Sequence, residues 1–210
     1  TSTEVTTSPK KINVVSGDLD TVGSEICIGE ECFYLISNDG YKVAMLAKYN
    51  LYVGGSYDGT SWTPYGEEAT GLQSSNMLGY VSKSIRNGTT SFSSDEQKGE
   101  NYSDYNGSIV QGYVNQYKSY LDNFDVLITD VRLITFDELI ELGCNNINKT
   151  CADALPFVYA TSYWTQSVVN SSQVWRVSSS KEFDNDSDIL CTNEKFMGVR
   201  PVIEVPLTEF

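Results

Sequence analysis

The stretch CFYLISNDGYKVAMLA, residues 32–47, carries the strongest structural signal in the chain. Two runs rich in apolar and aromatic residues flank a turn tripeptide at 38–40, which ends in Gly40. This pattern is typical of a β-hairpin. Residues 26–28, Ile-Cys-Ile, predict a further strand just before it. The sequence therefore predicts that the fold begins as antiparallel sheet.

Two helices are predicted in the middle of the chain. Ser108 closes a capping triplet, and apolar residues follow it at helical spacing as far as Leu121. Farther on, Thr135 and Glu138 form a capping box, and Gly143 ends the apolar face that follows. An extended segment is expected between these helices, over residues 126–134.

The last third of the chain returns to strand patterns, at residues 157–160, 163–165, 174–177 and 198–205. Alternation in the last two predicts one buried and one exposed face for each strand. Strands, then helices, then strands again favour an α+β domain of mostly antiparallel strands. Its long irregular loops include residues 49–105, which show too little periodicity for a prediction of elements.

The charge balance excludes some functions. Lys and Arg total 14 against 28 Asp and Glu, so the formal net charge is 14 − 28 = −14. Such a charge repels phosphate backbones, so no nucleic-acid partner is expected. The chain also has no His, which removes the commonest general base and the commonest zinc ligand. We therefore expect a non-catalytic protein.

Five cysteines indicate the compartment. Cys27 and Cys32 stand across a short turn, and Cys144 and Cys151 close a short polar loop, so two local disulfides are predicted. Disulfides fit an oxidising compartment. The alternative is a set of buried reduced thiols, and a zinc site is disfavoured by the spacing. Cys191 has no assigned role.

The N-terminal residues 1–11 are polar and the chain does not start with Met. We interpret them as a linker or stalk that follows a removed signal peptide or membrane anchor. Residues 12–210 are expected to form a single domain. No stretch is apolar for long enough to cross a bilayer.

The closing segments YWTQS (residues 163–167), VWRV (174–177) and GVRPVI (198–203) resemble the end of bacterial C-type-lectin-like domains. This group is related to formylglycine-generating enzyme and to the variable proteins of diversity-generating retroelements, and it has uncharacterised surface and prophage members. The resemblance covers roughly residues 125–205. It implies a C-type-lectin-like fold, with the last strand central in the sheet and the loops before it forming a binding face.

Two departures from that family limit what carries over. The enzymes of the group use a pair of cysteines near the end of the domain, where this chain has only Cys191. The Trp, Asn and Asp motif by which calcium-dependent lectins hold sugar is also absent. Function therefore has to be argued from the site itself.

Two sets of residues are candidates for a binding site. Six aromatic residues set among Gly, Ser and Asn have the composition of a protein-binding or sugar-binding surface, or else pin long loops onto the core: Tyr52, Tyr57, Trp62, Tyr65, Tyr102 and Tyr105. Three alternating carboxylates, Asp184, Asp186 and Asp188, predict either a calcium site or a solvated acidic loop.

Other conspicuous residues are expected to be structural. Trp164 and Trp175 lie in predicted strands. Arg200 is expected to form an ion pair or to cap backbone carbonyls. The carboxylates of Asp137, Glu138 and Glu141 fit the first turns of a capped helix without catalysis.

These observations lead to three hypotheses. The first is an extracellular, surface-displayed module that binds a glycan or a protein through the loops at 52–105 and 166–196. The second is a structural or tip subunit of a pilus-like or phage-like surface assembly. The third, ranked lowest, is a hydrolase that uses carboxylates, which would need two opposed carboxylates in a cleft.

Overall fold

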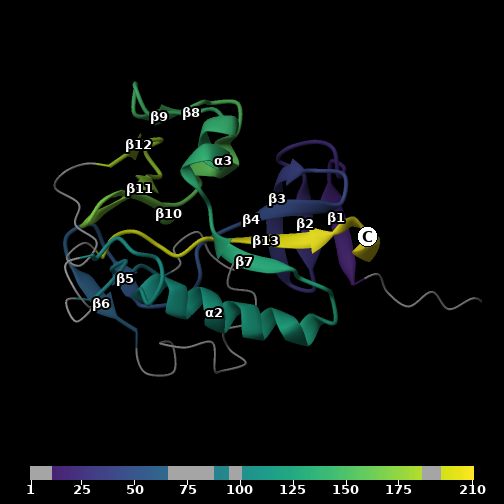
Figure 1. Ribbon diagram of the computed structural model, residues 1–210, viewed down its shortest axis with the longest axis horizontal. Helices are drawn as coiled ribbons and strands as arrows, with labels where there is room; N and C mark the ends of the chain where they lie inside the picture. The colour runs from purple at the N-terminus through teal and green to yellow at the C-terminus, as the bar shows by residue number, and fades with distance from the viewer. Residues whose placement is uncertain (1–10, 66–87, 95–100, 186–194) are drawn as a thin grey trace, which may run out of the picture.

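The computed structural model describes residues 11–65, 88–94, 101–185 and 195–210 (Figure 1). A large antiparallel sheet forms one end of the molecule, and the smaller sheets gather at the other end (Figure 1). The prediction of an α+β architecture with mostly antiparallel strands is confirmed. No helix among the described residues is long and apolar enough to span a membrane.

The large sheet has six strands in the order β1-β2-β3-β4-β13-β7, and every neighbouring pair is antiparallel. The predicted hairpin of residues 32–47 is confirmed as two central strands of this sheet. The last strand lies inside the sheet, between β4 and β7. The strand bounds are β1 Ile12–Ser16, β2 Glu25–Ile28, β3 Glu31–Asn38, β4 Lys42–Ala47, β7 Asp130–Leu133 and β13 Pro201–Pro206.

Both predicted helices are confirmed. Helix α2 (Ile109–Leu121) starts at Ser108, whose side chain accepts a hydrogen bond from the Gln111 N–H, and a short 3₁₀ turn η3 (Asp122–Phe124) follows it. Helix α3 (Phe136–Glu141) has the complete capping box of Thr135 and Glu138. In Figure 1, α2 runs along the sheet and α3 lies on its other side.

The two helices cover opposite faces of the sheet. Along β4, Val43 and Met45 belong to the core that contains the buried side chains of α2, whereas Leu46 belongs to the core that contains Leu139 of α3. The alternation of side chains along a strand sends successive residues to these two cores. The large sheet is therefore the middle layer of three.

This layering corrects the prediction that the last strand has one exposed face. In β13, Val202 packs on the α3 side and Ile203 on the α2 side, and both are fully buried. Only Glu204 and Pro206 are partly exposed. The prediction was wrong because a second layer covers each face, which the alternation within one strand does not reveal.

The rest of the fold consists of short strands. Strands β10 (Tyr163–Asn170), β11 (Gln173–Val177) and β12 (Phe183–Asp184) form one sheet, and β8 (Cys144–Asn145) and β9 (Thr150–Cys151) form a two-stranded ladder. β5 (Gly55–Tyr57) and β6 (Trp62–Pro64) form a hairpin within the segment for which the sequence predicted no elements. A terminal 3₁₀ turn, η5, spans Leu207–Glu209.

One predicted strand is wrong. Residues 157–160 lie mainly in the 3₁₀ helix η4 (Pro156–Tyr159). Pro156 occupies its first position, where the fixed φ of proline favours helical geometry and the missing N–H is not needed. Two carbonyl groups of this turn, those of Phe157 and Val158, accept hydrogen bonds from Arg200.

Arg200 fastens this turn to the large sheet. Its guanidinium is fully buried and donates hydrogen bonds to four backbone carbonyls. Two of these belong to the end of β4 and the residue after it, Ala47 and Lys48, and two belong to η4, Phe157 and Val158. Arg200 therefore caps backbone carbonyls, one of its two expected structural roles.

Both predicted disulfides are present. Cys27–Cys32 joins β2 to β3, and Cys144–Cys151 joins β8 to β9. In each case the two cysteines are directly opposite in the strand register. The disulfides therefore staple local hairpins, as their spacing predicted.

Candidate functional site

A cleft with a volume of about 710 Å³ lies beside the β5–β6 hairpin. This volume is in the range of small-ligand sites. We call it the Tyr57 cleft. It is lined by Asn50, Ser56, Tyr57, Asp58, Gly59, Thr89, Ala160, Thr161, Ser162, Ser179 and Phe196.

The hairpin that forms one wall of the cleft has a turn set by Asp58. Its Oδ1 accepts hydrogen bonds from the backbone N–H groups of Thr60 and Ser61, at 2.8 Å each, and its Oδ2 accepts one from the Ser61 hydroxyl. An Asp that bonds to the backbone two residues ahead is a common turn device. The turn brings Tyr57 opposite Trp62 in the register.

The same hydrogen bonds control the charge of Asp58. The N–H groups of Ser61 and Thr60 stabilise the carboxylate and lower the pKa of Asp58 below its usual value. Asp58 is therefore ionised at neutral pH. It is the only Asp, Glu, Lys or Arg among the described residues that line the cleft.

An aromatic patch forms a second feature of the cleft. The rings of Tyr57 and Phe196 have their centroids 5.9 Å apart, with an angle of 43° between their planes. Tyr57 is 41% exposed. The guanidinium carbon of Arg176 lies 5.9 Å from the Phe196 centroid. Two rings from segments far apart in sequence therefore meet at the cleft.

The floor of the cleft depends on Asn50, which is buried. Its Nδ2 donates to the Ser162 carbonyl at 2.9 Å, and its Oδ1 accepts from the Thr161 hydroxyl at 2.7 Å. A Cβ on Gly198 would lie 1.9 Å from the Asn50 side chain, so glycine is required there. Asn50 therefore holds the 160–162 segment in place and is a positioning residue.

Hydroxyl groups complete the lining. The Ser162 Oγ accepts the backbone N–H of Ser179 at 2.9 Å and lies 3.3 Å from the Ser179 Oγ. Thr89 lines the opposite side, where its hydroxyl points to the Gly55 carbonyl at 3.4 Å. The cleft thus combines aromatic rings, hydroxyls and one carboxylate.

The structure separates the six predicted aromatic residues into two groups. Four lie on or next to the β5–β6 hairpin: Tyr52, Tyr57, Trp62 and Tyr65. Tyr52 and Tyr65 stack, with centroids 4.2 Å apart. Burial, together with the neighbouring Tyr52, raises the pKa of Tyr65 to about 12. Tyr65 is therefore neutral at physiological pH.

The other two, Tyr102 and Tyr105, pack against the core beneath α2. Burial, followed by the charge of Asp130, raises the pKa of Tyr105 well above its usual value. Neither residue lines the Tyr57 cleft. These two match the alternative interpretation, in which aromatic residues pin a loop to the core.

The acidic run that suggested calcium begins at a buried position. Asp184 is 7% exposed in β12, and its Oδ1 lies 3.0 Å from the Nε of Arg176. Asp186 and Asp188 lie outside the described residues. A calcium ion at Asp184 would have to compete with the guanidinium for the carboxylate, so the structure lends no support to calcium there.

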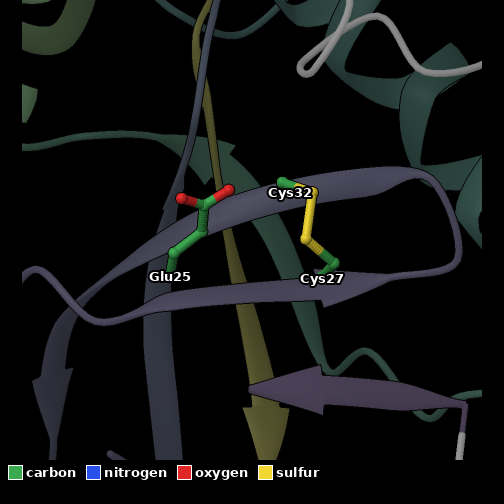
Figure 2. Close-up of side chains that lie close together, drawn as sticks. All are labelled: Glu25, Cys27 and Cys32. Atoms are coloured by element: carbon green, nitrogen blue, oxygen red, sulfur yellow. A yellow bond between two sulfur atoms is a disulfide. The ribbon is translucent and has the colours of Figure 1, made fainter. Parts of the chain in front are cut away.

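One further group has the composition of a metal site. The ligand atoms of Glu25, Cys27 and Cys32 lie within 4.8 Å of one another (Figure 2). Both sulfurs are joined in a disulfide, however, and metals bind the thiolate form of cysteine. Glu25 forms an ion pair with Lys48 at 2.6 Å. This group is therefore a cross-strand disulfide next to an ion pair.

Trp164 in β10 and Trp175 in β11 both pack against other aromatic or core residues. Trp164 is fully buried, and its Nε1 donates to the Thr90 carbonyl at 2.9 Å. Trp175 packs on Phe136 and Phe183, with centroids 4.8 and 4.9 Å away. Both contribute to packing rather than to the cleft.

The chain was compared with models of known families, with curated proteins and with solved structures. None of them matches. The likeness to C-type-lectin-like domains therefore stays a prediction, and the function has to be argued from the cleft.

Sequence reasoning missed Phe196, Asp58 and Asn50. The dipeptide Asp58-Gly59 is a turn signal that could have located the hairpin. Phe196 and Asn50 gave no such signal, because their place in the cleft depends on contacts with residues 111 and 139 positions away.

Proposed function

We propose that this protein is an exported, non-catalytic binding module of a bacterial cell surface that recognises a glycan at the Tyr57 cleft. The observation that carries the proposal is the pairing of Tyr57 with Phe196 above a lining of hydroxyls and one carboxylate. Aromatic faces attract the C–H faces of sugar rings, and the polar groups can exchange hydrogen bonds with sugar hydroxyls.

The compartment in this proposal is supported by the two disulfides, which persist in oxidising environments. The resemblance to C-type-lectin-like domains agrees with a binding role on a surface.

The test is a binding screen of the purified domain against arrayed glycans and extracellular-matrix proteins. We expect a glycan signal that Tyr57→Ala lowers at least tenfold. Tyr41→Ala is the matched control, because Tyr41 is also exposed but lies at the β3–β4 turn, outside the cleft. A signal on matrix proteins alone would replace the glycan with a protein ligand, and equal loss in both variants would refute a role for the cleft.

The same screen should be run with calcium and with a chelator. We expect binding to resist the chelator, because the Asp184 carboxylate is paired with Arg176. A signal lost with the chelator would indicate a calcium-dependent lectin. The variants Asp186→Asn and Asp188→Asn would then identify the ligands.

A second candidate function is a subunit of a surface assembly, and strand β1 favours it. β1 is an edge strand of the large sheet, and Val14 and Val15 on it are 39% and 52% exposed. An exposed edge can pair with a strand of another chain. The absence of a binding signal on both arrays, together with a concentration-dependent mass in light scattering, would favour this candidate.

A further inference from the structure

A second groove of about 350 Å³ lies near the Tyr57 cleft, against the other strand of the β5–β6 hairpin. We call it the Trp62 groove. Adjacent residues divide between the two sites, since Phe196 lines the cleft and Lys195 lines the groove. The groove is lined by Gly54, Trp62, Pro64, Thr90, Ser91, Ser93, Ser94, Ile109, Tyr113 and Lys195.

The indole of Trp62 is a fixed wall of this groove. Its Nε1 donates to the Thr89 carbonyl at 3.1 Å. Its ring also covers Gly55, where a Cβ would lie 2.6 Å from the indole Cε2. Position 55 must therefore be glycine for the ring to lie as it does. A ring held in this way offers its face to a ligand without further loss of conformational freedom.

Lys195 places a positive charge above that wall. Its Nζ lies 4.5 Å from the centroid of the Trp62 ring, within the range of a cation–π interaction. Lys195 is exposed, and it forms no ion pair with any residue that the structure describes. By contrast, Lys11, Lys42, Lys48 and Lys181 each pair with a carboxylate.

No Asp or Glu is among the described residues that line the groove, although the whole chain carries a net charge of −14. Its floor is a hydroxyl-rich segment, with Thr90 and three serines. An aromatic face, hydroxyls and one ammonium group are complementary to a sugar ring that bears a single carboxylate.

We propose that the Trp62 groove binds a uronic acid residue, whose ring lies on Trp62 and whose carboxylate meets Lys195. This inference rests on the proposed glycan-binding function and adds an acidic sugar to it. The net charge of the protein argues for one carboxylate rather than a densely sulfated chain, since the latter adds long-range repulsion. Charges more than about 8 Å away are largely screened at physiological salt, so the nearby lysine dominates for a small ligand.

The test is calorimetric titration with uronic acid disaccharides, each paired with the same disaccharide after its carboxyl group is reduced to a neutral alcohol. We expect the acidic member of a matching pair to bind at least tenfold more tightly. Lys195→Gln should abolish that preference, and Lys195→Arg should keep it. Lys181→Gln is the matched control, because Lys181 also lies over an aromatic ring, that of Tyr159 at 5.4 Å, but outside the groove.

A second readout reports on the ring itself. In a heteronuclear NMR titration, the acidic disaccharide should shift the Trp62 indole N–H signal, while those of the buried Trp164 and of Trp175 stay in place. The chain has three tryptophans, so Trp62→Phe assigns the signal.

The outcomes separate the two proposals. Equal affinity for the acidic and neutral members, with no effect of Lys195→Gln, would overturn the acidic-sugar proposal and leave glycan binding at the Tyr57 cleft intact. A preference that survives Lys195→Gln would overturn it as well. No binding of any disaccharide by the wild type, with a protein signal on the arrays, would overturn both proposals.

Discussion

The large sheet and the β5–β6 hairpin use the same residue types for opposite purposes. Arg200, just before β13, is fully buried and donates hydrogen bonds to four backbone carbonyls, whereas Lys195, five positions earlier, is exposed above the Trp62 ring. Tyr117, on α2, is fully buried, whereas Tyr57 is 41% exposed. Aromatic and cationic side chains are thus packed in the interior near the sheet, whereas at the hairpin they are exposed to solvent.

This difference follows from how many layers of structure cover each region. At the central strands of the large sheet both faces are covered, by α2 on one side and by α3 with its neighbours on the other. The hairpin has strands of three residues, and two reciprocal backbone bonds join it to Thr89: the Gly55 N–H donates to the Thr89 carbonyl at 3.0 Å, and the Thr89 N–H donates to the Gly55 carbonyl at 2.8 Å. A site that must remain accessible is thus carried by a rigid scaffold that is not itself exposed.

The largest effect is expected for Leu139→Asp, which places a charge in the core on the α3 face of the sheet. Leu139 is fully buried, and an unpaired buried charge costs several kcal/mol. We expect loss of the cooperative unfolding transition in circular dichroism. The control is Ile140→Asp on the same helix, where the side chain is 38% exposed; similar melting of the two variants would show that α3 is not packed as described.

Arg200→Met should come next. It leaves four buried carbonyls without their donor, and each unsatisfied buried group costs about 1–3 kcal/mol, partly relieved by rearrangement. We expect the free energy of unfolding, from urea denaturation, to fall by about 3–5 kcal/mol. Lys181→Met, at an exposed ion pair, should leave the free energy of unfolding nearly unchanged. A small loss for Arg200→Met would mean that η4 does not depend on this cap.

The difference between local and long-range contacts explains what the sequence could predict. The hairpin at 32–47, both helices with their caps and the two disulfides follow from local patterns, because residues near one another in the chain determine them. The position of Phe196 next to Tyr57 joins residues 139 positions apart, and no local pattern encodes it. Residues 157–160 were mispredicted for the same reason, since Arg200 stabilises that turn from a distant strand.

The acid sensitivity of the α3 cap gives a smaller effect. Burial raises the pKa of Glu138, but its hydrogen bonds and charge interactions with Arg132 and Thr135 outweigh burial and hold that pKa below its usual value. The stabilisation is therefore fully present above the unfolded-state pKa of about 4.3 and is lost as the pH falls through the lower folded-state pKa.

Glu138→Gln tests this dependence, because Gln keeps the capping geometry but not the charge. We expect a loss of about 1–2 kcal/mol in the free energy of unfolding at pH 7, from denaturation at a series of pH values. The difference from wild type should shrink below about pH 4. Asp137→Asn, an exposed neighbour, is the control; a difference that does not change with pH would contradict a role for the Glu138 charge.

The smallest effect on stability is expected for Tyr57→Ala, and its small size sharpens the contrast between the two regions. The ring is 41% exposed and its one ring contact is with Phe196, so removal should cost less than about 1 kcal/mol. In the same denaturation assay, Phe33→Ala, at a fully buried ring of β3, should cost about 3–5 kcal/mol. A loss for Tyr57→Ala that approached the Phe33 value would assign Tyr57 to the core and would leave the binding loss in that variant explained by unfolding.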